Sequence, residues 1–425
     1  MRRLVIDPSM IVVRGTVVLV LMVLCGACGQ TYRPVATPVT PPPPNPGFAH
    51  FALAITGNGL THPGASTSID VSGDTAVSRS TVGLMPVHAT FALGGTQVFV
   101  ANSADGSVSE FSPSTAAPVI TISLPSGMKA PVPVFVNTTQ NDFLWVADAA
   151  NNQVDAIALA NDVVAYMVGV GSNPVSLAET PDGQKLYVAN AGNGSGGSVS
   201  SINPSDRSLN TVTTTVAWVS PVSVVSRSDS QIAFVLDEGS GMVAAIDTAS
   251  DTVVATASVG VGANFMTYDN SRNRLYVSNP AASNVTILDA ASAGLTTIAV
   301  VPVTNPVSIA ALPDGSRAYV SSATVSGSDV TSQVTVINAA DGSIRSTIGL
   351  GAATSACAAS PSRLSIAASA DSSRVYVGNC DAGNVAVIAT LSDTVVLPIP
   401  APQSSVLGSN GMPLPQTPVF VVAGP

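Results

Sequence analysis

The sequence predicts an all-β protein, a single β-propeller of four-stranded antiparallel blades. The main evidence is a five-residue strand that occurs seven times: an aliphatic residue or Ala, an aromatic residue, Val, usually a small residue, then usually Asn or Asp. The copies are Val98–Asn102, Leu144–Asp148, Leu186–Asn190, Ala233–Asp237, Leu275–Asn279, Ala318–Ser322 and Val375–Asn379. A repeat of roughly 20–50 residues is typical of solenoids and propellers. A charged fraction of 9%, with 35 Gly, favours short strands and tight turns over helices.

Each copy is followed by the same succession of strands and turns, which is clearest after Leu186. A Gly/Ser turn leads to the alternating segment 199–203, a Thr/Val strand follows at 209–216, and Ser220-Pro221-Val222 begins another strand before the next copy. Four short strands separated by turn residues form one antiparallel sheet, the blade of a propeller. Asp-Gly pairs, as at 182–183, favour the tight hairpins.

Eight blades are expected, with seven as the alternative. Units that begin at Phe51 and at the seven copies are 42 to 57 residues apart, and the first carries a degenerate strand at 51–55. Segment 417–422 aligns with 305–310, the innermost strand of a unit, so the end of the chain would complete the blade that begins at Phe51. Strands from both termini would then close the ring and leave no open sheet edge. In the seven-blade alternative, residues 51–95 are partly irregular.

Two positions of the repeat have expected roles. The aromatic residue at the second position should pack between adjacent blades. The Asn or Asp at the fifth position should bond the backbone of the following hairpin as an Asx-turn. The other interpretation of the fifth position is a ring of ligand-binding carboxamides.

The copies Leu-Tyr-Val-Ala-Asn at 186–190 and Leu-Tyr-Val-Ser-Asn at 275–279, with Ile-Asp or Ile-Asn and then Pro-Val later in the unit, resemble the YVTN-type β-propeller repeat family. The resemblance extends from about Phe51 to the end of the chain, and we assign residues 48–425 to the propeller. It implies an exported or surface protein of a bacterium or archaeon. The family by itself would favour seven blades, whereas the internal count favours eight.

Residues 1–28 predict an export signal. Three Arg precede an apolar run, Thr16–Leu24, that is too short to span a bilayer, since a spanning helix needs about 20 residues. Leu24-Cys25-Gly26-Ala27-Cys28 resembles a bacterial lipobox, which implies that Cys28 is lipidated as the first residue of a mature lipoprotein. The alternative is an ordinary secretory signal cut near Ala27. Translation from Met10 would leave a signal of ordinary shape.

The segment 29–47 is expected to be a semi-rigid spacer, because it includes four consecutive prolines at 41–44. Gly29, in place of Asp after Cys28, argues by resemblance to the bacterial sorting rule for the outer membrane. We therefore expect a protein of the cell envelope that is attached to the membrane only by lipid. Whether it faces the periplasm or the cell surface stays open.

The charge of the chain excludes one class of partner. The net charge is −10, and removing residues 1–28 takes away three Arg and one Asp, which leaves −12. Nucleic acid is not an expected partner, because phosphate binding needs clustered basic residues. We expect a monomer.

Cys357 and Cys380 are predicted to form a disulfide. After the signal and the lipidated cysteine are set aside they are the two remaining thiols, and thiols of exported proteins tend to pair. Cys357 lies in the long connection that enters the last blade, and Cys380 lies in the hairpin after that blade's second strand. In a four-stranded blade both connections emerge on the same face. The alternative is two free thiols.

No catalytic, cofactor-binding or metal-binding residue is predicted. The three histidines, His50, His62 and His88, are not at ligand spacing from one another or from a carboxylate cluster. His50 and His62 are expected to be solvated, and His88 to be structural near the channel. A Gly-x-Ser-x-Gly elbow is missing from the sequence, and the Gly-rich stretch 192–197 joins two strands.

The function expected from the sequence is binding or scaffolding without catalysis, through loops on one face of an envelope-anchored propeller. Loops on a rigid frame commonly carry recognition. The partner would be an unidentified envelope protein or a glycan. The alternative is a hydrolase or lactonase with its site at the central channel, which would need convergent acids, bases or a metal there.

Overall fold

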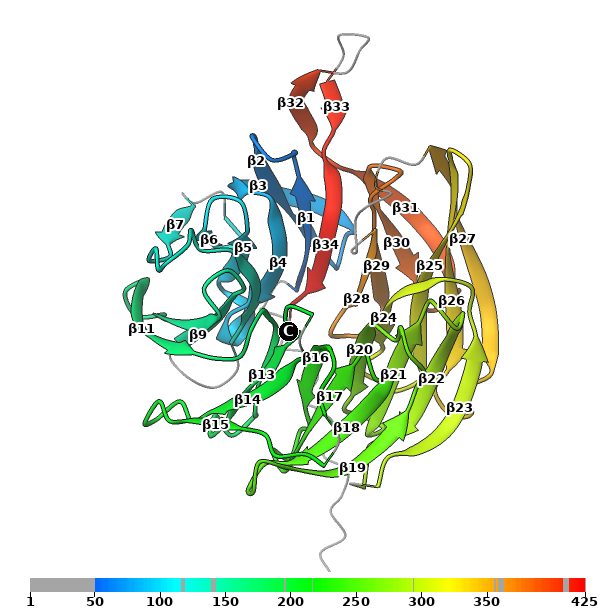
Figure 1. Cartoon of the computed structure of the whole chain (residues 1–425). Coiled ribbons are helices and arrows are strands. Elements are labelled where there is room, and N and C mark those ends of the chain that lie inside the picture. Colours follow the sequence, from blue (N-terminus) through cyan, green and yellow to red (C-terminus); the bar gives the residue numbers. More distant parts are fainter. Residues whose placement is uncertain are drawn as a thin grey trace, which may run out of the picture. The chain divides into compact units, whose positions relative to one another are not determined.

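The computed structural model describes residues 50–424, apart from 116–118, 139–142, 195, 216, 293, 355–356, 358–362 and 408–412. In this part of the chain, eight four-stranded antiparallel sheets form the blades of a propeller, which we letter A to H in chain order (Figure 1). The prediction of eight blades is confirmed. The predicted export signal, Cys28 and the spacer lie outside the described residues.

Strands within a blade are numbered here from the innermost to the outermost. Blade A comprises β34 (Thr417–Ala423), β1 (Phe51–Gly57), β2 (Pro63–Asp70) and β3 (Thr75–Leu84); blade B β4 (Pro86–Phe91), β5 (Val98–Asn102), β6 (Ser107–Phe111) and β7 (Ile120–Ser123); blade C β8 (Pro133–Asn137), β9 (Phe143–Asp148), β10 (Gln153–Ala158) and β11 (Val163–Gly169); blade D β12 (Pro174–Glu179), β13 (Leu186–Asn190), β14 (Ser198–Ile202) and β15 (Leu209–Thr211).

Blade E comprises β16 (Pro221–Ser226), β17 (Ile232–Asp237), β18 (Met242–Asp247) and β19 (Thr252–Ser258); blade F β20 (Phe265–Asp269), β21 (Arg274–Asn279), β22 (Asn284–Asp289) and β23 (Thr296–Pro302); blade G β24 (Pro306–Ala311), β25 (Arg317–Ser326), β26 (Asp329–Asn338) and β27 (Ile344–Thr354); blade H β28 (Leu364–Ala368), β29 (Arg374–Asn379), β30 (Asn384–Ala389) and β31 (Thr394–Pro400). A 3-10 turn lies at Leu93–Gly95, and β32 (Gln403–Leu407) pairs with β33 (Pro413–Pro415) in a separate hairpin.

The two ends of the described chain meet in blade A. β34 pairs antiparallel with β1, with Leu53 opposite Val422 and Thr56 opposite Pro418. The innermost strands contact one another around the whole ring, and β34 lies between β28 and β4. Closure by both termini, as predicted, gives the first blade its innermost strand and covers the edge of β1.

The degenerate repeat copy is displaced by one residue from its predicted position. In blade B, Asn102 at the fifth position pairs with Pro86 of the innermost strand. Pro418 is the equivalent proline of blade A, and it pairs with Thr56, so Thr56 occupies the fifth position. The copy is therefore 52–56 and not 51–55. A register shift between Ile55 and Thr56, of the kind seen at the same place in blade B, fixes this alignment.

Eight apolar clusters fill the spaces between consecutive blades, as the repeat predicted. The aromatic side chains at the second position are buried and each belongs to a cluster shared with the next blade: Phe99, Trp145, Tyr187, Phe234, Tyr276, Tyr319 and Tyr376. In the A–B cluster the residue at this position is Leu53, with Ile55 and Val82 beside it. Large buried rings repeated around an axis make the interblade core.

The connections divide between two faces of the propeller. The hairpins between second and third strands and the blade-to-blade connections lie on one face, which we call the connection face. The hairpins between first and second and between third and fourth strands lie on the other, which we call the turn face. Among the described residues, no helix has the length and apolar character needed to cross a membrane.

Candidate functional site: the connection face

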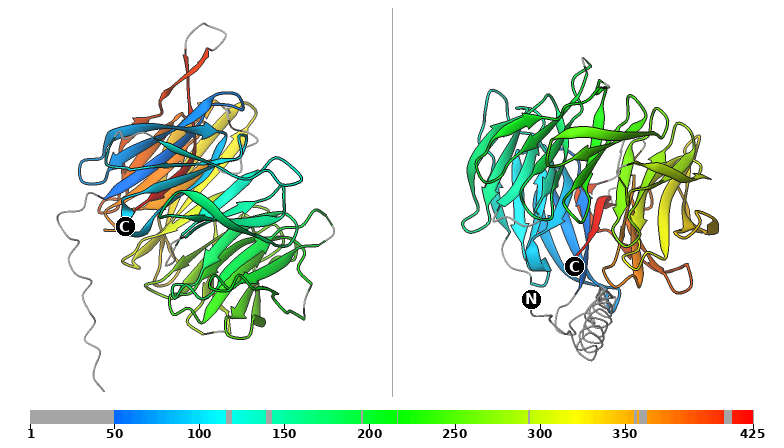
Figure 2. Two further views of the ribbon diagram at one scale, coloured as in Figure 1. Left: turned by 90° about the vertical axis from the view of Figure 1, so that its left-hand side faces the viewer. Right: turned by 90° about the horizontal axis from the view of Figure 1, so that it is seen from below.

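Additions to the repeat gather on the connection face of three consecutive blades, G, H and A. β25 continues four residues past the fifth repeat position, to Ser326, and pairs with a matching extension of β26. The connection from G to H occupies 355–363, and the connection from H to A contains the β32–β33 hairpin. This hairpin projects away from the blades (Figures 1 and 2). We call these three segments the loop cluster.

A disulfide fixes the G–H connection to blade H. Cys357 is bonded to Cys380 of the β29–β30 hairpin, with Cα atoms 6.1 Å apart, which confirms the predicted pair. Both ends lie on the connection face because the two connections emerge on the same side of the blade, as the four-strand order requires. The bond therefore ties Cys357, within the connection, to blade H.

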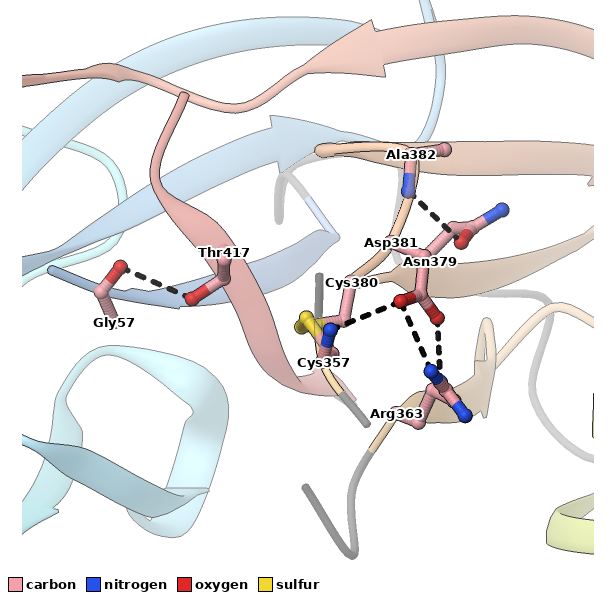
Figure 3. Close-up of a disulfide and its surroundings, with 8 residues drawn as sticks. All are labelled: Gly57, Cys357, Arg363, Asn379, Cys380, Asp381, Ala382 and Thr417. Carbon is pink, nitrogen blue, oxygen red and sulfur yellow. Dashed lines mark hydrogen bonds and ion pairs between the residues drawn. A yellow bond between two sulfur atoms is a disulfide. The ribbon is translucent and has the colours of Figure 1, made fainter. Parts of the chain in front are cut away.

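An ion pair lies beside the disulfide (Figure 3). The Arg363 Nε donates to the Asp381 carboxylate at 2.5 Å, and the backbone N–H of Cys357 donates to the same carboxylate at 3.0 Å. The Asp381 side chain is fully buried, and that of Arg363 is 11% exposed. Because a buried carboxylate is costly without partners, these bonds position the segment that leads into β28. Neither residue was singled out by the sequence, since only their place next to the cysteines could have suggested them.

The base of the β32–β33 hairpin is tied to blade A. Thr56 Oγ1 donates to Gln416 Oε1 at 2.6 Å, and Ser404 Oγ donates to Asn58 Oδ1. The backbone N–H of Gln416 donates to the carbonyl of Pro402 at 2.8 Å, which holds the two ends of the hairpin together. Because its two ends are adjacent, the hairpin is an insertion in the connection from β31 to β34.

Exposed apolar residues also favour the connection face. Apart from those on the outermost strands, the exposed large apolar side chains of the described residues lie on the connection face, with Leu391 on the turn face as the exception. Those on the connection face are Leu60, Met85, Met128, Val219, Val261 and Val325. They are distributed over several connections around the ring, with Val325 in the loop cluster and Leu60 in the β1–β2 hairpin of blade A, and they give this face an apolar character.

Charged residues show the opposite distribution. The exposed acidic and basic side chains of the described residues lie mostly in the hairpins of the turn face, such as Asp182, Asp229, Arg272, Asp314 and Asp341. On the connection face, exposed charges include Asp105, Lys129 and Asp329. The two faces therefore differ in chemistry: the turn face is densely charged, and the connection face is sparsely charged with apolar residues among Gly, Ser and Asn.

The fifth-position Asn and Asp residues are buried and bonded within the protein. Asp148 Oδ1 accepts from the backbone of Ala150 in the following hairpin, and Asn279 and Asn379 bond their hairpins in the same way. These positions confirm the Asx-turn prediction. In blades B and D the Asn side chain instead donates to two serines of the third strand, at 3.0 to 3.2 Å, as Asn190 does to Ser198 and Ser200.

The histidines make no common site. His88 stacks on Phe135, with ring centroids 3.8 Å apart, and meets the tilted ring of Phe420 at 4.5 Å. Its Nδ1 accepts from the N–H of Val136 at 3.4 Å. Burial lowers the pKa of His88 to about 3, so its ring is neutral. Ser176, at the position of His88 in blade D, accepts in the same way through its Oγ from the N–H of Val224 in blade E. His88 therefore has the structural role that was predicted. In the part of the chain that the structure describes, no three His, Cys, Asp or Glu side chains gather to hold a metal.

Comparison with known proteins identifies the fold. No protein-family model matches the sequence, and the curated proteins include no match to it. Solved structures do match. AztD from Citrobacter koseri, solved in its apo form, is similar over 88% of this chain and 98% of its own, with 12% identity and a TM-score of 0.61.

Two further structures are similar at a lower score. One is described as a candidate 6-phosphogluconolactonase of Bacteroides fragilis (90% of this chain, 100% of its own, 12% identity, TM-score 0.53), and the other is hydrazine synthase of Kuenenia stuttgartiensis (72% and 96%, 20% identity, TM-score 0.53). The chain is a β-propeller. At these identities the likeness concerns the fold alone, because propellers with different functions share one frame.

Proposed function

We propose that the protein is a non-enzymatic binding or scaffold protein of the cell envelope, which contacts its partner through the connection face at blades G, H and A. The observation that carries this proposal is that the loop cluster lies on the same face as the exposed apolar residues. A disulfide and a buried ion pair hold part of this cluster in place, and a preorganised loop loses less entropy when it binds.

A protein partner suits this face better than a glycan. The exposed apolar residues are Leu, Met and Val, not the aromatic rings on which sugars stack. Aliphatic side chains with few charges around them match the composition of the cores of protein interfaces. The channel-hydrolase alternative has less support, because His88, a titratable side chain of the innermost strand β4, is neutral and is in contact with the rings of Phe135 and Phe420.

Matched charge substitutions on the two faces test the binding proposal. The domain of residues 48–425, immobilised, would be used to capture partners from envelope extracts, and the L60R/V325R double variant would be compared with L391R on the turn face. We expect L60R/V325R to lose the captured protein and L391R to retain it. Equal capture by all three proteins, or equal loss in L391R, would contradict the use of the connection face.

Anchoring by Cys28 belongs to the same proposal. The lipobox-like sequence and the spacer of residues 29–47 suit a propeller that is held away from a membrane by one lipidated cysteine. The resemblance of the repeat to the YVTN type agrees with an exported protein. In cells that make Cys28→Ser, we expect the protein to move from the membrane fraction to the soluble envelope fraction. An unchanged distribution would reject lipid anchoring and leave the binding proposal intact.

A further inference from the structure

The same electrostatic contact occurs at three blade interfaces of the turn face. In each, an Asp ends the turn between the third and fourth strands of a blade. Its carboxylate accepts a hydrogen bond from the second-position Tyr of the preceding blade. It also forms an ion pair with the basic residue two positions before that Tyr. The three sets are Asp251 with Tyr187 (2.7 Å) and Lys185 (2.6 Å), Asp393 with Tyr319 (2.5 Å) and Arg317 (2.7 Å), and Asp74 with Tyr376 (3.4 Å) and Arg374 (2.8 Å).

Asp162 is the fourth aspartate at this position of a turn. It directly precedes the first residue of its outermost strand, as the other three do, and all four have φ between 51° and 57°. A shared backbone conformation at a shared position aims their carboxylates in the same way, toward the preceding blade. In each of the other three interfaces, a positively charged side chain balances the turn carboxylate.

Blade B offers Asp162 no positive side chain. Gln97 stands at the position of Lys185 and Phe99 at that of Tyr187, and the neighbouring strand adds Glu110 opposite Phe99. Asp162 lies within hydrogen-bond reach of Glu110, and Gln97 Nε2 donates to Glu110 Oε1 at 2.8 Å. Among the described residues no Lys or Arg pairs with either carboxyl group. Two acidic groups thus meet where three other interfaces place an acid and a base.

Glu110 is buried and partly unpaired. Glu110 is 4% exposed, and besides the carboxyl group of Asp162 no polar group of the described residues lies in hydrogen-bond contact with Oε2. Burial and the neighbouring carboxyl of Asp162 raise the pKa of Glu110 to about 7. A buried carboxylate oxygen that faces a second carboxyl needs a positive partner to be stable in the charged form.

A groove beside this pair gives Asp162 access to solvent, while Glu110 stays buried behind it. The groove, of about 470 Å³, lies between the outermost strands of blades B and C, and Asp162 is part of its wall. Thr121, Ser123 and Tyr166 also line the groove, and the Tyr166 hydroxyl donates to the carbonyl of Pro204, so water would supply the neutral oxygen atoms of a bound ion. Carboxylates accompanied by neutral oxygen atoms and water are the ligands that Ca²⁺ accepts, whereas transition metals favour His and Cys.

We propose that Glu110 of β6 and Asp162 of the β10–β11 turn bind a hard divalent cation of the Ca²⁺ class at the outer part of the interface between blades B and C. The cation takes the electrostatic place that Lys185, Arg317 and Arg374 have at the other interfaces. It links two blades, so its binding stabilises the ring. With two carboxylates the affinity falls in the range of extracellular calcium modules, roughly 0.1–1 mM. The sequence had predicted no metal, because the two residues are far apart along the chain and match no motif.

Calcium titration of the purified domain tests this site. After treatment with EGTA at pH 7.5, the unfolding temperature is measured from 0 to about 10 mM CaCl₂, and Tb³⁺ luminescence, sensitised by Tyr166, is followed as a second readout. We expect a saturable rise of roughly 2 °C and Tb³⁺ emission that CaCl₂ displaces. Glu110→Gln should abolish both responses, and the control Asp251→Asn, at an interface that has its own lysine, should retain them.

Gln97→Lys is the complementary variant. It installs the amine that the other interfaces use, so the protein without calcium should be as stable as the wild type with calcium, and the calcium response should disappear. No response of the wild type to CaCl₂ would overturn the proposal. Stability that falls as the pH rises through 7 would then show that the two carboxyl groups share only a proton. A response that persists in Glu110→Gln would overturn it as well.

Discussion

At the scale of single residues, buried carboxyl groups decide how neighbouring strands and blades are joined. Asp393 accepts from the Tyr319 hydroxyl and pairs with Arg317 and Arg345, and its side chain is 5% exposed. Burial, and then the bond to Asp393, raises the pKa of Tyr319, so the hydroxyl stays a donor. One carboxylate thus satisfies three donors from blade G.

Asp393→Asn should therefore destabilise the protein. The amide keeps the size of the side chain but removes the charge that Arg317 faces, and breaking a buried ion pair costs about 3 kcal/mol. Urea unfolding measures the change in the free energy of unfolding. Asp341→Asn, at an exposed turn residue of blade G, is the matched control and should unfold at the wild-type urea concentration. If both variants behave alike, the interblade contact contributes nothing of note.

Blade C has two aspartates where blades B and D have an asparagine and a serine. Asp148 takes the place of the fifth-position Asn. Asp155 takes the place of the third-strand serine that pairs with the Val of the repeat. Asp155 is fully buried, and burial together with the Asp148 charge raises its pKa to about 7. Its Oδ2 has no hydrogen-bond partner among the described residues.

This pKa predicts a pH dependence of stability. Asp155 binds a proton more tightly in the folded than in the unfolded protein, so its contribution is fully present below about pH 4 and is lost as the pH rises through 7. The Asp155→Asn variant has no charge at this position. Its unfolding temperature should therefore fall less between pH 5 and 8 than that of the wild type. Thermal unfolding across that range measures the difference. Parallel curves for the two proteins would contradict the assignment.

At the scale of strands, the repeat predicted what each copy does, because burial in a propeller follows the sequence period. The seven second-position aromatics and the closing strand near Val421 were found from the pattern alone. The first copy was misplaced by one residue, since Ala52 and Leu53 give no aromatic signal and the bulge after Ile55 cannot be read from apolar residues. The long interval between the copies that begin at Ala318 and Val375 indicated an insertion, but it did not reveal the structure of that insertion.

The interblade ion pairs and the contact between the two buried carboxyl groups were beyond prediction from one sequence. Asp74 meets Arg374 from 300 residues away, and Glu110 meets Asp162 across two blades, so no local spacing marks either pair. The β32–β33 hairpin was missed because its short strands, rich in Pro and Ser, lack the alternation of a blade strand. The candidate binding face could be predicted as a type of surface, and its location on blades G, H and A required the structure.

The disulfide belongs to this scale, because it joins two connections. It closes a segment of 23 residues, and a loop of that length gives roughly 3 kcal/mol in the chain-entropy account. The C357S/C380S double variant should lose about that much free energy of unfolding. Dithiothreitol should destabilise the wild type similarly and leave the variant unaffected, and intact mass should rise by two hydrogens on reduction. Equal masses with and without reductant would reject the bond in solution.

At the scale of the whole molecule, the ring depends on one strand that comes from the far end of the chain. β34 pairs with β1 and contacts β28 and β4 on its two sides, so it joins blade A to both neighbours. Side chains of this strand pack in the H–A and A–B clusters. Without it, β1 would present an unpaired edge to solvent, and exposed edges of this kind lead to aggregation.

A chain that ends at Gln416 should therefore fail to form a closed propeller. We expect loss of cooperative thermal unfolding and aggregation during size-exclusion chromatography, because the deletion opens the ring and uncovers two apolar interfaces together. The matched control removes 404–414 and joins the remaining ends with Gly-Gly. Pro402 and Gln416 are already hydrogen-bonded to each other, so this larger excision should leave the unfolding temperature within a few degrees of the wild type. If the chain that lacks β34 stayed monomeric with wild-type cooperativity, seven complete blades would suffice, and closure by both termini would not be what holds the ring together.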